Sequence, residues 1–113
     1  MRFQSALTRT IVATRRILII DDTDSSLLAL QKFFQHAEYT VFTAQNGKEG
    51  LDAALKYLPD IIVSDVIMPE MDGLTLAQQI RARGFAMPIV LLTSNPAAVR
   101  EADDARCLSA TLQ

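Results

Sequence analysis

Residues 60–73 have the sequence Asp-Ile-Ile-Val-Ser-Asp-Val-Ile-Met-Pro-Glu-Met-Asp-Gly. An apolar run ends at Asp65, and Pro69 and the pair Asp72-Gly73 mark the loop that follows. A short apolar run between turn signals predicts a buried strand. Because a carboxylate is rarely placed at the end of a buried strand without a partner, Asp65 is the first candidate for a functional residue.

The composition around this stretch indicates one small acidic domain. The chain has 113 residues and is 50% hydrophobic, which suits a single folded unit. Four arginines precede the first acid, Asp21: Arg2, Arg9, Arg15 and Arg16. The rest holds seven Lys and Arg against 13 acids, a balance of -6. This charge argues against direct nucleic-acid binding, and no apolar run approaches the roughly 20 residues of a membrane span.

The N-terminal segment and the cysteine content give two further expectations. Residues 1–15 contain no acid and resemble a transit peptide only loosely, so we expect a flexible extension before a folded domain at 16–113. The single cysteine, Cys107, cannot form an internal disulfide. This indicates a reducing compartment, and we predict a cytoplasmic protein.

Strands and helices are expected to alternate along the domain. The predicted strands cover residues 16–20, 39–44, 60–65, 89–92 and 107–110. The predicted helices begin at Thr23 or Asp24, run from Asn46-Gly47 to Tyr57, and cover 74–83 and 97–106. Their expected inward residues are Leu27, Leu28, Leu30, Phe33 and Phe34 in the first helix, Leu51, Ala54, Leu55 and Leu58 in the second, and Leu74, Leu76, Ala77 and Ile80 in the third.

Three of the predicted strands are uninterrupted apolar runs, which is typical of strands covered on both faces. The alternation therefore predicts a doubly wound α/β fold, with a parallel sheet, helices on both sides and right-handed crossovers. In such sheets ligands bind beyond the carboxyl ends of the strands. Those ends carry Asp21-Asp22, Asp65 and Thr93-Ser94, so we expect these side chains to converge.

Three converging carboxylates repel one another at neutral pH unless some keep a proton or a cation binds. All-oxygen ligands suit Mg²⁺ or Mn²⁺, and one His and one Cys do not make a zinc site. With such a cation bound, one carboxylate can act as a nucleophile and form an aspartyl-phosphate. Thr93 or Ser94 can donate a hydrogen bond to a phosphoryl oxygen.

Three motifs carry a family resemblance. They are Ile-Ile-Asp-Asp at 19–22, Ser-Asp-Val-Ile-Met-Pro-Glu-Met-Asp-Gly at 64–73 and Pro-Ile-Val-Leu-Leu-Thr-Ser at 88–94. In order and spacing they resemble the receiver domain of two-component response regulators, of the chemotaxis-regulator kind, over residues 16–94. The resemblance implies a flavodoxin-like, five-stranded parallel sheet in the order 2-1-3-4-5, flanked by five helices.

The resemblance also implies roles for individual residues. Asp65 becomes the phosphoacceptor and a ligand of the metal, Mg²⁺ or Mn²⁺. Asp22 becomes a direct metal ligand, Asp21 acts through the metal's water, and the backbone carbonyl of Ile67 completes the protein ligands. The phosphoryl group would come from a histidine kinase or a phosphotransfer protein. Such a domain is not an enzyme beyond its own phosphorylation and dephosphorylation.

The same resemblance assigns a switch and a loop. Thr93, with Ser94 beside it, becomes the switch hydroxyl that moves toward the phosphoryl group, while Pro69 and Gly73 shape the loop after the third strand. Phosphorylation would then change which protein contacts are stable. The downstream partner is a protein of unknown identity.

The C-terminal region departs from the family pattern. Receivers carry a Lys at the end of the fifth strand, but this chain has no Lys after Lys56, and Ala110 takes the expected position, followed by Thr111 in place of a Pro. The fifth strand lies either over 107–112 or beyond Gln113, and the helix that follows it is expected to be missing. A truncation, a frameshift and a genuinely divergent receiver all fit this tail. A missing helix would expose a sheet face and favour a homodimer.

Two alternatives to the phosphoacceptor were weighed. The absent Lys favours a degenerate receiver that acts as a non-phosphorylated protein-interaction module, whereas the intact acids oppose it. An aspartyl-nucleophile phosphatase needs a second Asp two residues after the nucleophile. That position is Ile67, so we set this class aside.

Overall fold

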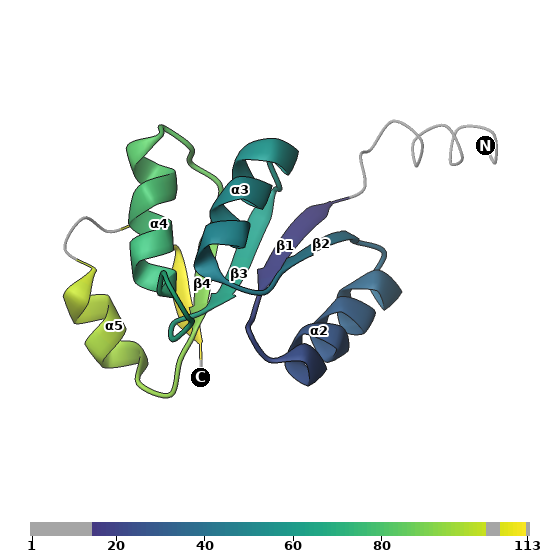
Figure 1. Ribbon diagram of the computed structural model, residues 1–113, viewed down its shortest axis with the longest axis horizontal. Coiled ribbons are helices and arrows are strands. Elements are labelled where there is room, and N and C mark those ends of the chain that lie inside the picture. The colour runs from purple at the N-terminus through teal and green to yellow at the C-terminus, as the bar shows by residue number, and fades with distance from the viewer. Residues whose placement is uncertain (1–14, 104–106, 113) are drawn as a thin grey trace, which may run out of the picture.

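The computed structural model describes residues 15–103 and 107–112. Along these residues strands and helices alternate (Figure 1): β1 (Arg16–Ile20), α2 (Asp24–His36), β2 (Thr40–Ala44), α3 (Gly47–Tyr57), β3 (Ile61–Asp65), α4 (Gly73–Ala82), β4 (Ile89–Leu92), α5 (Pro96–Ala102) and β5 (Ala110–Leu112). The strands are all parallel and form one sheet in the order β2-β1-β3-β4-β5. The predicted doubly wound fold and its strand order are confirmed.

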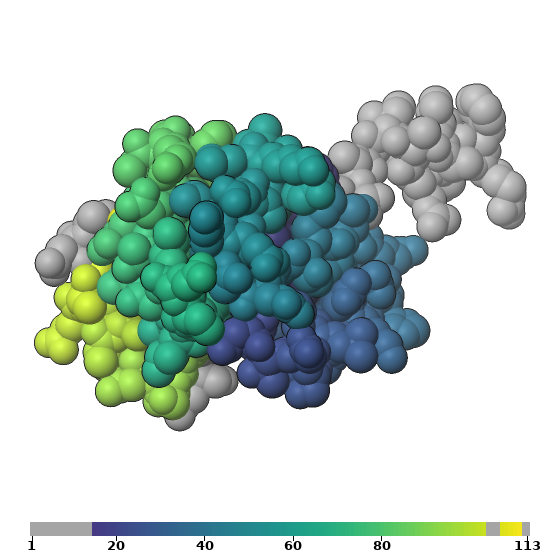
Figure 2. Space-filling model, viewed as in Figure 1, coloured from purple at the N-terminus to yellow at the C-terminus, as the bar shows by residue number. Residues whose placement is uncertain are grey.

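Helices cover both faces of this sheet. On one face α3 and α4 pack against each other and against the strands, where Leu18, Ile62 and Ile80 are fully buried. Figure 2 is seen from this side, and the two helices largely hide the sheet. On the other face Leu27 of α2 packs in a second cluster with Ile19. Because both faces are covered, the central strands are apolar on both sides, as the uninterrupted runs predicted.

Polar caps fix where three of the helices begin. Asn46 caps α3, Asp72 caps α4 and Asn95 caps α5, and each side chain accepts a hydrogen bond from the backbone N–H three residues later, at 2.7 to 3.2 Å. Such caps satisfy N–H groups that the first helical turn leaves without partners. Gly84 follows α4 with a φ of 86°, which confirms it as a residue suited to ending that helix.

Three residues predicted to face the core lie on the surface. Leu28, Phe33 and Leu58 are 51%, 65% and 49% exposed. The inward stripe of α2 passes through Leu27, Leu30 and Phe34, and Leu28 and Phe33 fall outside it. Leu58 is the C-cap of α3, where a φ of 48° has already turned the chain out of the helix.

The fifth strand is present, but it begins three residues later than predicted. Ala110, expected at the end of this strand, is its first residue and lies opposite Val90. The strand cannot begin earlier because the backbone N–H groups at 107 and 108 donate to the Asp103 carboxylate, at 2.7 and 2.9 Å. The helix predicted over 97–106 is α5, which ends at Ala102. The rest of that prediction, at 104–106, and the predicted extension at 1–14 lie outside the described residues.

Candidate functional site

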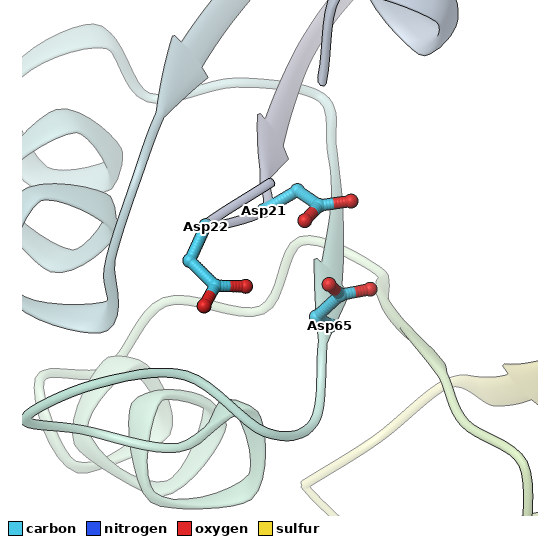
Figure 3. Close-up of side chains that lie close together, drawn as sticks. All are labelled: Asp21, Asp22 and Asp65. Carbon is cyan, nitrogen blue, oxygen red and sulfur yellow. The ribbon is translucent and has the colours of Figure 1, made fainter. Parts of the chain in front are cut away.

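The carboxyl ends of β1 and β3 bring three acids together. The register pairs Ile20 with Ser64, so the next residues, Asp21 and Asp65, stand level on neighbouring strands. Asp22 follows directly in the turn toward α2. One carboxylate oxygen from each of the three acids lies within 4.8 Å of the others (Figure 3). The structure therefore brings together the acids that strand topology predicted to converge.

The three carboxylates differ in their surroundings. Asp21 is only 4% exposed, and its Oδ1 accepts a hydrogen bond of 2.9 Å from the backbone N–H of Thr23. Thr23 precedes α2 and its own hydroxyl makes no capping bond, so the Asp21 carboxylate fixes the entry to this helix. Asp22 is exposed, and the exposure of Asp65 is intermediate between those of Asp21 and Asp22. The site thus has one fixed acid and one that faces solvent.

Crowding changes the protonation of Asp65. Its pKa is raised from an ordinary value of 3.8 to about 7, first by burial, then by a hydrogen bond with Asp21 and by the negative charges of Asp21 and Asp22. In that hydrogen bond the neutral Asp65 carboxyl donates to the Asp21 carboxylate. Near neutral pH Asp65 is therefore only partly ionised, and a divalent cation bound by the cluster would favour its ionised form.

This set of donors fits a magnesium-sized cation. Its ligand atoms are all oxygens, and the exposure of Asp22 leaves one side open to the waters that Mg²⁺ keeps. The direct ligand roles of Asp22 and Asp65 and the water-mediated role of Asp21 stay predictions. The Ile67 side chain is 85% exposed, and the role of its backbone carbonyl as a ligand stays a prediction.

The loop from β3 to α4 is closed tightly at its base. The backbone N–H of Gly73 donates to the Val66 carbonyl at 2.7 Å, and a Cβ at Gly73 would collide with the carbonyl oxygen of Asp65. The buried Ser64 hydroxyl donates to the same Asp65 carbonyl at 2.9 Å. Pro69 lies exposed at the outer part of the loop. Gly73 is thus needed for the close approach of helix and strand end, in agreement with its predicted loop-shaping role.

The predicted switch residues follow β4. Thr93 is half-buried, and its hydroxyl accepts a hydrogen bond of 3.1 Å from the backbone N–H of Asn95, the residue that caps α5. Ser94 is exposed. The structure therefore joins the Thr93 hydroxyl to the start of α5, whereas the switching roles of Thr93 and Ser94 stay predictions.

No basic side chain neutralises the acidic site within residues 15–103 and 107–112. Burial, the hydrogen bond with Asp21 and the charges of Asp21 and Asp22 all act to raise the pKa of Asp65. Ala110, expected in the place of the family's Lys, lies opposite Val90, two residues before the level of Leu92 and Asp65. The assignment of Ala110 to the position of the family's Lys stays a prediction.

A second buried acid, Asp103, was not predicted from the sequence. Asp103 is 9% exposed and anchors the turn before β5 by accepting two backbone hydrogen bonds. Arg81 of α4 supports the same turn, since its Nε donates to the Cys107 carbonyl at 3.0 Å. Cys107 is buried, and this burial, followed by the nearby Asp103 carboxylate, raises the pKa of its thiol. In the sequence, an acid just after a helix looks the same whether its carboxylate accepts buried backbone hydrogen bonds, as Asp103 does, or faces solvent.

The doubly wound sheet and the acids at its carboxyl edge define an α/β fold with an acidic site, and comparison with known proteins gives the family. The family model "Response regulator receiver domain" matches residues 17–111. The chain belongs to the receiver domains of two-component response regulators.

Curated relatives agree with this assignment. The chain is 38% identical over 80 residues to the alkaline phosphatase synthesis transcriptional regulatory protein PhoP of Bacillus subtilis, covering 71% of this chain and 33% of that protein. It is 39% identical over 79 residues to the response regulator MprA of Mycolicibacterium vanbaalenii, covering 70% and 34%. The chain thus spans about a third of the length of these relatives.

Solved structures show the same fold. The chemotaxis protein CheY4 of Vibrio cholerae superposes with a TM-score of 0.80 at 30% identity, over 88% of this chain and 86% of that one. The response regulator TrrA of Thermotoga maritima, solved in complex with Mg²⁺ and BeF, gives 0.79 at 28% identity, over 88% and 85%. Within the described part of the chain, every helix is too short or too polar to cross a membrane.

Proposed function

We propose that this domain accepts a phosphoryl group on Asp65, in a Mg²⁺-dependent step, from a histidine kinase or a phosphotransfer protein. The observation that carries the proposal is the cluster of three carboxylates within 4.8 Å, built from two strand ends. Acids that crowd without a basic partner destabilise the fold unless a ligand compensates them. TrrA, whose structure contains Mg²⁺ and BeF, provides a similar fold that accommodates such a ligand.

The chemistry at Asp65 is a direct displacement. A carboxylate oxygen attacks the phosphorus atom, a new O–P bond forms, and the bond from phosphorus to the donor breaks with its electron pair leaving on the donor. When bound, Mg²⁺ supplies positive charge to the transferring oxygens. The ionised form of Asp65 is the reactive one.

The added charge gives Thr93 a new hydrogen-bond acceptor. To donate to a phosphoryl oxygen on Asp65, its hydroxyl would turn toward that oxygen, which would change the geometry of the hydrogen bond that it accepts from the N–H of Asn95. Asn95 caps α5, and α5 has no buried residue that would hold it in place. Phosphorylation would therefore alter the start of α5 and the protein contacts available there.

The second candidate is a receiver that binds partners without being phosphorylated. The lack of any Lys after Lys56 favours it, because the family uses that cation at the phosphoryl group. In this case the acidic site would bind a divalent cation but no phosphoryl group would be retained. A homodimer is compatible with either candidate and stays a prediction.

Intact mass spectrometry separates the two candidates. The chain is incubated with acetyl phosphate, with and without Mg²⁺, beside Asp65→Asn and the matched control Asp52→Asn, which alters an exposed acid of α3. We expect one phosphate in the wild type and in Asp52→Asn only with Mg²⁺, and none in Asp65→Asn. No adduct on a folded wild-type chain would reject the phosphoacceptor and leave the interaction module. Sedimentation of the same samples tests the homodimer.

A further inference from the structure

The start of α3 lies directly against the loop that leaves β3. Gly47 is the first residue of this helix and is buried. A Cβ atom placed on it would collide with the carbonyl oxygen of Met71 and lie 2.7 Å from the Met71 Cβ. Real Cβ atoms do not approach so closely, so the loop backbone would have to move away from the helix.

A second glycine of the same helix provides a contrast. A Cβ on Gly50 would meet the Ile20 side chain, at 2.6 Å from Cδ1 and 3.1 Å from Cγ1. An isoleucine side chain can rotate to relieve part of this contact, and the backbone of β1 need not move. An added methyl group at Gly50 therefore disturbs the core, whereas at Gly47 it displaces the loop.

The loop has little freedom to absorb such a displacement at its α4 end. Gly73 already packs on the carbonyl of Asp65, and its N–H is bonded to Val66. Asp72 is fixed as the N-cap of α4 through a bond of 2.7 Å to the Thr75 N–H. A displacement of Met71 by a Cβ atom at position 47 would therefore move residues 66–70, which directly follow Asp65 of the acidic site.

We propose that Gly47 is a positioning residue, which sets the distance between the β3–α4 loop and the acidic site and thereby the affinity of that site for a divalent cation. It acts through the backbone of Met71 and touches none of the three acids. The proposal rests on the proposed function only in its consequence for phosphorylation. Its effect on cation binding stands independently of whether Asp65 is phosphorylated.

The test compares Gly47→Ala with Gly50→Ala, both glycine-to-alanine changes on the same helix. Mg²⁺ binding is measured by isothermal titration calorimetry, with circular dichroism to show that each variant is folded. We expect affinity to fall about tenfold in Gly47→Ala, the scale on which supporting residues act on metal sites. Gly50→Ala should bind as the wild type does. Equal affinity of Gly47→Ala and wild type, or an equal loss in both variants, overturns the proposal.

A measurement on the wild type covers the case in which Gly47→Ala does not fold. Mg²⁺ is added while backbone amide resonances are followed by NMR. We expect the amides of Gly47 and Met71 to shift along with that of Asp65, and the amide of Gly50 to stay unchanged. An unmoved Gly47 resonance at saturation overturns the proposal. If Mg²⁺ binds with these shifts but acetyl phosphate leaves no adduct, the proposed function fails and the positioning role is retained.

Discussion

Replacing Asp65 by Asn should stabilise the metal-free domain at neutral pH. The substitution removes the charge that the site disfavours most, since the pKa of Asp65 is raised to about 7 by burial and by its two acidic neighbours. In the unfolded chain the carboxyl has its ordinary pKa of 3.8 and ionises freely. Asparagine has nearly the same shape and keeps an N–H that can donate to Asp21.

The size of the gain follows from the difference between the two pKa values. A rise in the pKa from 3.8 to about 7 corresponds to a free energy of about 4 kcal/mol for a fully desolvated group. Asp65 is only half-buried, and solvent screening reduces the expected gain to about 1 to 2 kcal/mol. The stability that the neutral form of Asp65 contributes is fully present at pH below 3.8, its pKa in the unfolded chain. This contribution is lost as the pH rises through about 7, the pKa of Asp65 in the folded chain. The advantage of Asp65→Asn is therefore largest above neutral pH.

The assay is urea unfolding followed by circular dichroism in the presence of a chelator. At about pH 7.5 the variant should unfold at higher urea than the wild type, and at about pH 5 the difference should fall to less than half. Asp52→Asn, an exposed acid of α3, is the control and should show no such dependence. The claim that the three acids repel one another in the folded state would be falsified if Asp65→Asn were no more stable than the wild type, or if its gain in stability were the same at both pH values.

Three other substitutions probe the scaffold and the switch. Asn46→Ala removes the cap of α3 and should lower the free energy of unfolding by about 1 kcal/mol, measured by urea unfolding. Asp103→Ala leaves the buried N–H of Cys107 and the partly buried N–H of Leu108 without their partner and should cost about 2 to 3 kcal/mol in the same assay, whereas the exposed neighbour Glu101→Ala should cost almost nothing. Thr93→Val should still acquire one phosphate by intact mass, but NMR should show no accompanying change at the start of α5; an α5 that still responds would remove Thr93 from the switch.

The fold was predictable because its signals are local and repeated. Uninterrupted apolar runs identified β1, β3 and β4, and the acids directly after two of them showed where the carboxyl edge of the sheet would lie. Parallel topology then brings such strand ends together without any contact having to be predicted. The convergence of Asp21, Asp22 and Asp65 follows from chain order alone.

The errors lie where packing decides and the pattern does not. Leu28 and Phe33 are as hydrophobic as their buried neighbours, and only the orientation of α2 on the sheet leaves them outside. The beginning of β5 depends on Asp103 capturing the backbone N–H groups at 107 and 108, which no periodicity reveals. Ala110 was consequently placed at the wrong end of its strand.

Gly47 and Gly73 are a third kind of case. The sequence marks both as turn residues before a helix, and in the structure both permit a close approach of backbones. Their value lies in the missing side chain, so it becomes visible only when the opposing carbonyl of Met71 or Asp65 is in place. Sequence alone cannot distinguish such a glycine from one that merely ends a strand.

The electrostatics of the site argue for a ligand more strongly than any single residue does. Three acids meet at the end of buried strands, one of them 4% exposed, and no basic side chain of the described residues pairs with them. Selection for stability alone would favour replacing one acid, because a neutral isostere removes the repulsion and keeps the hydrogen bond. An arrangement that lowers stability where the fold places its ligand site is typical of function. A bound ligand could supply the positive charge that the described residues lack, and a divalent cation would do so in the function proposed above.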